Sequence, residues 1–149
     1  MKIYKEFTFD CAHMLSDYTG ACRNIHGHTY KLQVEVIGQP LEVGDCRGML
    51  IDFKDLKTAV HVAILDKVDH AMLFSGNGRM NAAEQAILQV CQTYDLKHFQ
   101  FPANMRTTAE EMSAYFKQEV FCHLQKAGYR NIEEVVIRLW ETPTSCAEA

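Results

Sequence analysis

Two segments of the chain alternate between apolar and polar side chains, and each apolar row has histidine at one end, the last position of the first row and the first two of the second. The first segment is residues 2–13, whose apolar row holds Ile3, Phe7, Phe9, Cys11 and His13. The second segment is residues 26–37, whose row holds His26, His28, Tyr30, Leu32, Val34 and Val36. Since residues i and i+2 of a strand project from the same face, the pattern predicts two half-buried strands. An antiparallel pairing across residues 14–25 would bring the three histidines together.

These three histidines predict a metal site. A single histidine at the end of an apolar strand is more often a hydrogen-bonded core residue, but two adjacent inward imidazoles in His26-Gly-His28 need partners. Imidazole suits zinc as well as copper, iron and nickel, and we predict zinc bound by His13, His26 and His28. Three protein ligands leave the fourth position on zinc open, which is typical of catalytic rather than structural sites.

Cys22 precedes His26 by four residues and allows two interpretations. Beside a metal cation the pKa of its thiol would fall, and the thiolate would act as a base or nucleophile. Alternatively, its sulfur is the fourth zinc ligand and closes a structural Cys-His₃ centre. The spacing is compatible with both.

Two further positions place charged groups at the ends of predicted elements. Asp69-His70 follows a helix, either as a cap with a solvated imidazole or as a carboxylate that orients a proton-shuttling histidine. Glu141 ends the apolar row of residues 132–141, where an unpaired buried charge is costly. It either pairs with a core Arg or Lys or accepts two parallel N–H donors from a planar ligand.

Capping residues, apolar stripes and glycine stops predict the remaining elements. These are a helix capped by Asp52 that ends before Asp69, a helix over 81–93, a helix from Thr107 or Thr108 to Gly128, and a strand over 132–141. No repeat, low-complexity segment or linker divides the chain. We therefore expect residues 1–149 to form a single α+β domain.

The composition is that of a soluble globular protein, with 48% hydrophobic and 23% charged residues. The net charge of −4 argues against a nucleic-acid or membrane-surface partner, although a local cluster of basic residues would suffice for an anionic small molecule. No apolar run is long enough to span a membrane. The first residues lack the apolar segment of a secretory signal, so we expect a cytoplasmic protein with free thiols.

The order and spacing of several short motifs resemble the 6-pyruvoyltetrahydropterin synthase family over nearly the whole chain. The motifs are Ala12-His13, Cys22-x-x-x-His26-Gly27-His28, Gly48-Met-Leu-Ile-Asp52-Phe53-x-x-Leu56-Lys57, Asp69-His70, Thr108-Ala-Glu110 and Trp140-Glu141-Thr142-Pro143. Each motif alone is weak, but together they are specific. The short gap between Cys22 and His26 resembles the 6-carboxytetrahydropterin synthase branch, because the pyruvoyl branch has a longer gap.

The resemblance implies a T-fold, or tunnelling fold, in which helices pack on one face of a four-stranded antiparallel sheet. Three subunits would close a twelve-stranded barrel, and two trimers would stack into a homohexamer. Closing a barrel removes the exposed edges of the sheet. The resemblance matches the zinc ligands to His13, His26 and His28, the catalytic triad to Cys22, Asp69 and His70, and the pterin anchor to Glu141.

The function implied by the resemblance is zinc-dependent conversion of 7,8-dihydroneopterin triphosphate to 6-carboxy-5,6,7,8-tetrahydropterin, acetaldehyde and triphosphate. This lyase reaction belongs to 7-deazaguanine and queuosine biosynthesis. The alternatives are 6-pyruvoyltetrahydropterin synthase activity, which retains the side chain, and a non-catalytic zinc-stabilised binding module. Two departures from the family pattern fall between His70 and Thr107: the helix over 81–93 is additional, and Leu73-Phe74-Ser75 stands where Asn or Asp often follows the leucine.

Overall fold

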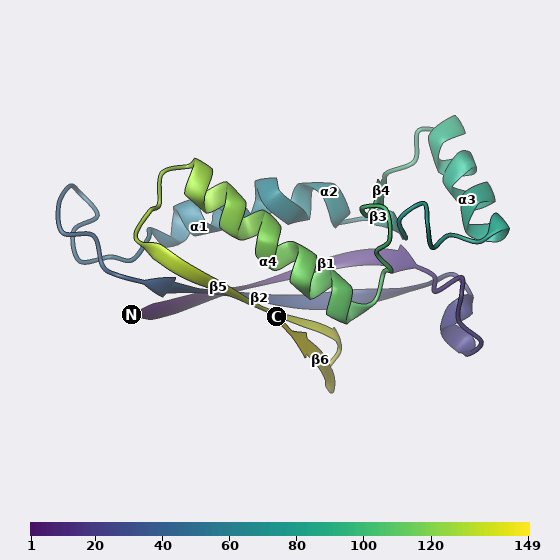
Figure 1. Cartoon of the computed structure of the whole chain (residues 1–149), viewed down its shortest axis with the longest axis horizontal. Helices are drawn as coiled ribbons and strands as arrows, with labels where there is room; N and C mark the ends of the chain where they lie inside the picture. Colours follow the sequence, from purple (N-terminus) through teal and green to yellow (C-terminus); the bar gives the residue numbers. More distant parts are fainter.

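The two alternating segments form the centre of a six-stranded sheet in the computed structural model, which describes all of residues 1–149 (Figure 1). The sheet order is β4-β3-β1-β2-β5-β6. Its strands are β1 (Lys2–His13), β2 (His26–Gly38), β3 (Ala71–Phe74), β4 (His98–Gln100), β5 (Ile132–Thr142) and β6 (Ser145–Glu148). The helices are α1 (Phe53–Val60), α2 (Asp66–Val68), α3 (Ala82–Thr93) and α4 (Ala109–Lys126).

The predicted antiparallel pairing of β1 with β2 is confirmed, and β5 pairs antiparallel with the other edge of β2. The apolar rows of these three strands face the helices α1 and α4, which cover one face of the sheet (Figure 1). Burial of these rows against the helices provides the hydrophobic driving force for the fold. Fully buried members of the core include Tyr30, Leu32, Leu56, Phe116 and Ile137.

The prediction of a four-stranded antiparallel sheet is wrong, because the sheet has six strands. Strands β1, β2, β5 and β6 are antiparallel neighbours, but β3 pairs parallel with β1 and β4 pairs parallel with β3. The two additional strands are only four and three residues long. Segments this short carry too few residues for alternation to distinguish a strand from a loop.

The predicted helix starts are confirmed. Asp52 caps α1 by accepting a hydrogen bond from the Lys54 N–H, and Thr108 caps α4 by accepting one from the Glu111 N–H. A π-helical turn, His61–Leu65, joins α1 to α2. It lets three consecutive residues, Ala63–Leu65, be buried together, a local widening that a helical period does not predict.

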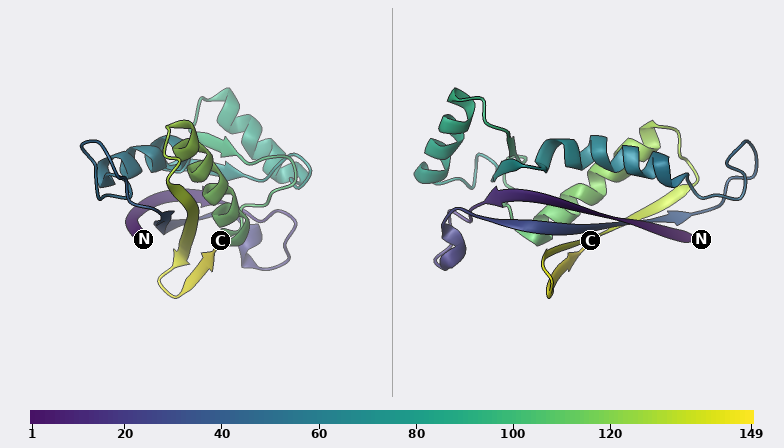
Figure 2. Two further views of the ribbon diagram at one scale, coloured as in Figure 1. Left: turned by 60° about the vertical axis from the view of Figure 1, so that its left-hand side comes forward. Right: turned by 180° about the vertical axis from the view of Figure 1, so that it is seen from behind.

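Helix α3 lies beyond the end of the sheet, at the same end as the loop between β1 and β2 (Figures 1 and 2). The loop of residues 39–52 projects at the opposite end. All six cysteines are free thiols, as expected. None of the helices has both the length and the apolar character needed to cross a membrane.

Candidate active site

Strand register brings the three predicted metal ligands together. His13 pairs directly with His26 at the end of the β1–β2 ladder, and His28 lies opposite Cys11 two residues further along. The ring centroids of His13 lie 4.5 Å from His26 and 5.3 Å from His28, and those of His26 and His28 are 5.0 Å apart. One nitrogen from each ring lies within 4.8 Å of the other two. The expected clustering is therefore confirmed.

The hydrogen bonds of these rings leave nitrogen lone pairs directed into the cluster. His13 Nδ1 lies 2.8 Å from the Thr107 carbonyl oxygen, and His26 Nδ1 lies 2.8 Å from the Asn24 carbonyl oxygen. A carbonyl oxygen only accepts, so each Nδ1 donates and each Nε2 keeps its lone pair. The Nε2 atoms of His13 and His28 are buried and have no hydrogen-bond partner.

Such a donor set fits a metal ion. Metal-binding histidines commonly donate their second ring nitrogen to a carbonyl or carboxylate, which fixes ring orientation. Buried polar atoms without partners are rare in folded proteins, and here they converge on one point. His13, His26 and His28 would hold the ion.

Burial also favours the neutral form that metals bind in two of these ligands, His13 and His28. Burial lowers the pKa of His13 to about 4, with the Thr107 carbonyl and Glu141 opposing the shift and the neighbouring histidines adding to it. Burial likewise lowers the pKa of His28. Since a metal ion competes with protons for imidazole, lowered pKa values favour binding at neutral pH.

We expect the metal-free protein to lose stability as the pH falls from about 6.5 towards about 4. In this range His13 is protonated in the unfolded chain but neutral in the folded one, so the unfolded state binds more protons and acidification favours it. Urea unfolding at about pH 7 and about pH 5 measures the loss. His13→Gln should reduce it, whereas His123→Gln, near the other end of α4, should not. An undiminished loss in His13→Gln would contradict this origin.

Glu141, at the end of β5, faces the histidine cluster. Its Oε1 lies 3.6 Å from His13 Nε2 and 3.5 Å from His28 Nε2, and it accepts a hydrogen bond of 3.2 Å from the Tyr30 hydroxyl. No Arg or Lys forms an ion pair with it, so the interpretation as half of a core salt bridge is wrong. Its side chain is 31% exposed and therefore accessible to a ligand.

Tyr30 is a site residue that the sequence interpretation placed only in the apolar core. Its ring is fully buried, while its hydroxyl reaches Glu141. Burial raises the pKa of this phenol, and the Glu141 carboxylate beside its hydroxyl acts in the same direction. The feature of the sequence that could have indicated this role is the position of Tyr30 two residues after His28, on the same face of β2.

Cys22 lies in a 3₁₀ turn, Ala21–Arg23, and is exposed. Its sulfur is not among the ligand atoms that gather within 4.8 Å of one another. It lies in the loop between His13 and His26, which pair at the end of the β1–β2 ladder, so the thiol is at the same end of the sheet as the histidine cluster. This geometry favours an open three-histidine site with a nearby thiol over a closed Cys-His₃ centre.

Asp69 and His70 form a hydrogen-bonded pair, with His70 Nδ1 2.9 Å from Asp69 Oδ1. Asp69 is the C-cap residue of α2, and its Oδ1 also accepts the Asp10 N–H at 3.0 Å, so the position both ends the helix and fixes the carboxylate against β1 and the imidazole. Burial acts to raise the pKa of Asp69, but the hydrogen bonds from Asp10 and His70 hold it below its usual value. His70 has a φ of 58°, a strained conformation typical of functional positions, and its side chain is 76% exposed.

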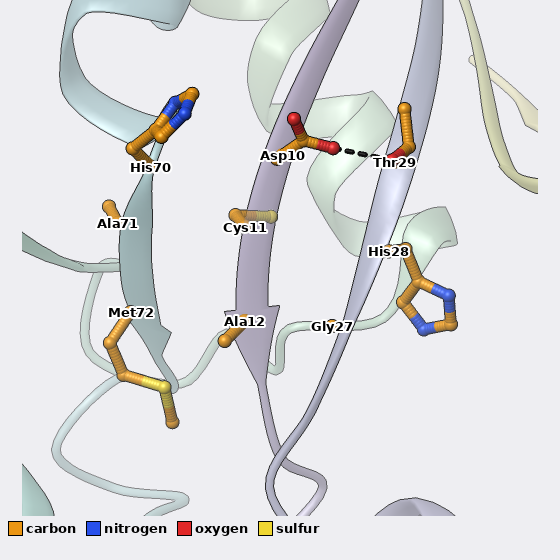
Figure 3. Close-up of a pocket in the computed structure, with 9 residues that line it drawn as sticks. All are labelled: Asp10, Cys11, Ala12, Gly27, His28, Thr29, His70, Ala71 and Met72. Carbon is orange, nitrogen blue, oxygen red and sulfur yellow. Dashed lines mark hydrogen bonds between the residues drawn. The ribbon is translucent and has the colours of Figure 1, made fainter.

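His70 borders a surface pocket of about 510 Å³ over strands β3, β1 and β2 (Figure 3). Figure 3 shows His70 and His28 on opposite sides of β1, with the His28 ring turned away from His70. No hydrogen bond or ion pair within the chain joins Cys22 to Asp69 or His70. One chain therefore assembles the histidine cluster with Glu141. Within that chain, the Asp69–His70 pair makes no contact of this kind with Cys22, the remaining member of the predicted triad.

The family model described as "6-pyruvoyl tetrahydropterin synthase" matches residues 2–149. The chain belongs to this family. A protein of Haemophilus influenzae named 6-carboxy-5,6,7,8-tetrahydropterin synthase is 44% identical over 147 residues, covering 99% of this chain and 96% of the relative. A protein of the same name from Aquifex aeolicus is 32% identical over 128 residues, covering 85% of this chain and 74% of the relative. The family and branch identified from the motifs are confirmed.

Solved structures of the 6-pyruvoyl tetrahydropterin synthase family share the fold. That of the Plasmodium falciparum enzyme aligns with a TM-score of 0.72 at 21% identity, over 100% of this chain and 96% of the other. The Caenorhabditis elegans enzyme aligns with a TM-score of 0.66 at 19% identity, over 100% of this chain and 94% of the other. At these identities the likeness shows the fold alone.

Proposed function

We propose that the protein converts 7,8-dihydroneopterin triphosphate and one water molecule to 6-carboxy-5,6,7,8-tetrahydropterin, with release of acetaldehyde and triphosphate. The observation that carries this is the convergence of the unpartnered His13 and His28 nitrogens beside Glu141, with Cys22 in the loop between His13 and His26. The name of the Haemophilus influenzae relative supports the choice of reaction. The product would serve 7-deazaguanine and queuosine synthesis in the cytoplasm.

Each residue has a distinct role in this proposal. Glu141 accepts two N–H donors from the pterin ring, which a carboxylate does with high geometric specificity. The Cys22 thiolate removes a side-chain proton, and His70, oriented by Asp69, transfers the second proton. Zinc held by His13, His26 and His28 would supply Lewis-acid polarisation of the substrate hydroxyls.

The separation of Cys22 from the Asp69–His70 pair supports a site completed between subunits. We propose that Asp69 and His70 of one subunit meet Cys22 of another. Strand β6 presents an unpaired edge, and β3 pairs with β1 only at Cys11 and Ala12, so most of the outer edge of β1 is unpaired as well. Natural proteins commonly cover such edges by pairing or by barrel closure. Three copies of the antiparallel strands β1, β2, β5 and β6 would supply a twelve-stranded barrel, and two such trimers a homohexamer.

Product mass tests this proposal. Zinc-loaded protein incubated with 7,8-dihydroneopterin triphosphate should yield the 6-carboxy product together with acetaldehyde. A pyruvoyl product, which keeps the terminal carbons, would retain the site assignment but replace the reaction with that of the sister branch. No turnover by the zinc-loaded protein would overturn the enzymatic proposal and favour a zinc-stabilised binding module.

A further inference from the structure

Glu84, in the first turn of α3, is a fully buried carboxylate that forms no ion pair with Lys, Arg or His. Its two oxygens are instead used by two separate segments. Oε1 accepts the Ser75 N–H at 2.8 Å, just after β3, and Oε2 accepts the Ser16 hydroxyl at 2.5 Å. The Asn81 side chain caps the helix by accepting the Glu84 N–H at 2.9 Å. Burying a polar group costs free energy unless it is hydrogen-bonded, as both oxygens of Glu84 are here.

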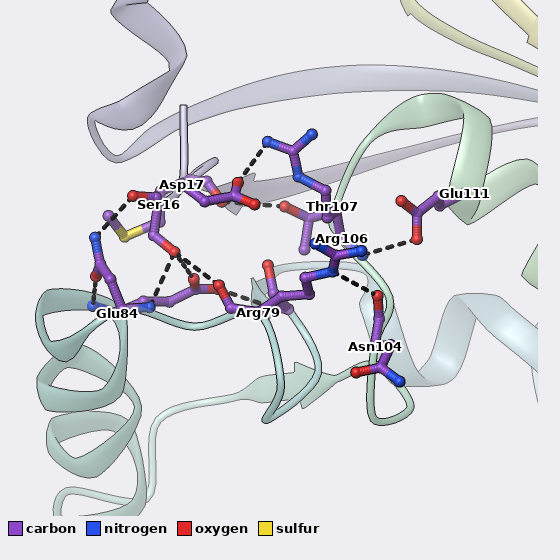
Figure 4. Close-up of polar contacts among 11 residues, drawn as sticks. Ser16, Asp17, Arg79, Glu84, Asn104, Arg106, Thr107 and Glu111 are labelled. Carbon is purple, nitrogen blue, oxygen red and sulfur yellow. Dashed lines mark hydrogen bonds and ion pairs between the residues drawn. The ribbon is translucent and has the colours of Figure 1, made fainter. Parts of the chain in front are cut away.

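The start of α3 forms hydrogen bonds with both the hydroxyl and the carbonyl oxygen of Ser16 (Figure 4). Besides donating to Glu84, its hydroxyl oxygen accepts the Asn81 N–H at 3.2 Å. Its carbonyl oxygen accepts from the Asn81 side-chain amide at 2.8 Å. One residue of the β1–β2 loop is therefore fixed to the additional helix through three hydrogen bonds.

Leu15, the residue before Ser16, is hydrogen-bonded to the backbone of Cys22. The Leu15 N–H donates a hydrogen bond to the Cys22 carbonyl oxygen at 2.9 Å. This bond joins the two sides of the β1–β2 loop beyond the end of the strand ladder. A second contact to the β1–β2 loop is the ion pair of Arg106 with Asp17, the residue after Ser16 (Figure 4). The segment 75–106 thus contacts Ser16 and Asp17, and the neighbouring Leu15 is hydrogen-bonded to Cys22.

We infer that Glu84 is a positioning residue that sets the place of Cys22 through Ser16 and Leu15. The additional helix α3 is then a support for the loop that carries the thiol. The catalytic part of this inference rests on the proposed function of Cys22, whereas the mechanical part does not. A misplacement of about 1 Å at a catalytic group can lower turnover about a hundredfold, so such a support has a direct functional value.

Amide hydrogen exchange on the full-length protein tests the mechanical part. Glu84→Ala removes the carboxylate that accepts the Ser16 hydroxyl, so we expect exchange within residues 14–25 to be about tenfold faster. Glu84→Gln keeps an acceptor for Ser75 and a partner for Ser16, and should restore slow exchange. The hydrogen-bonded loop 39–52, at the other end of the molecule, serves as an internal reference and should be unchanged. Gln89→Ala, an exposed change on the same helix, should leave both loops unchanged.

Unchanged exchange in residues 14–25 of Glu84→Ala would overturn the inference, as would equal acceleration in both loops. If Glu84→Ala does not fold, Ser16→Ala removes the same contact from the loop side and must accelerate the same amides. In turnover, Glu84→Ala should lower kcat about tenfold or more with little change in KM, because Glu141 and its neighbours are untouched. A change confined to KM would contradict a role through Cys22. If the unaltered protein shows no pterin turnover, the proposed function fails while the exchange result still decides the mechanical coupling.

Discussion

Cys22→Ala is expected to lower turnover of 7,8-dihydroneopterin triphosphate by at least about a thousandfold while zinc remains bound. The sulfur is not among the clustered ligand atoms, so its removal leaves all three imidazoles and their backbone hydrogen bonds in place. What disappears is the proposed proton acceptor. Metal content measured by elemental analysis, together with steady-state kinetics, separates the two effects.

Cys122→Ala is the matched control, since Cys122 is an equally free and exposed thiol on α4. It should keep both zinc and activity. Loss of zinc from Cys22→Ala would show instead that the thiol is the fourth ligand of a closed centre. Full activity in Cys22→Ala would remove the thiol from the mechanism.

His28→Ala should weaken zinc binding by more than about a hundredfold and abolish turnover with it. Changes even to the groups that support a ligand cost about 10–100-fold in affinity, and loss of the ligand itself removes a bond to the ion. His28 is preferable to His13 as the position to change, because its side chain is 19% exposed against 1%. Folding is therefore less at risk in this variant.

Competition with a chromophoric chelator gives the zinc affinity. His123→Ala on α4 provides the comparison, because it removes an imidazole that takes no part in the cluster. Zinc should raise the melting temperature of His123→Ala and of the unaltered protein, since a ligand that binds only the folded state stabilises it. An unaltered zinc affinity in His28→Ala would place the metal elsewhere.

The histidine cluster was predictable because it depends on two local rules. Alternation in a strand has a period of two residues, and a short loop favours an antiparallel neighbour. These rules place His13, His26 and His28 on one face and at one end of the ladder. Pairing of Asp69 with His70 also follows from adjacency, although the positive φ at His70 does not.

Other parts of the site depend on contacts between distant segments. The Thr107 carbonyl that orients His13 is 94 residues away in the chain, and the Tyr30 hydroxyl meets Glu141 over 111 residues. Glu84 reads as an ordinary first-turn acid of a helix until the fold brings Ser16 to it. Short strands β3 and β4 were missed because their pairing, rather than their pattern, makes them strands.

X-ray absorption at the zinc edge tests the central claim most directly, because it reports the atoms bound to the metal in the working protein. The account predicts imidazole nitrogens at about 2.0–2.1 Å and a light oxygen or nitrogen scatterer in the remaining position, with no sulfur. The spectrum should be the same for Cys22→Ala. A sulfur shell at about 2.3 Å that disappears in Cys22→Ala would contradict the open site and establish a closed Cys-His₃ centre.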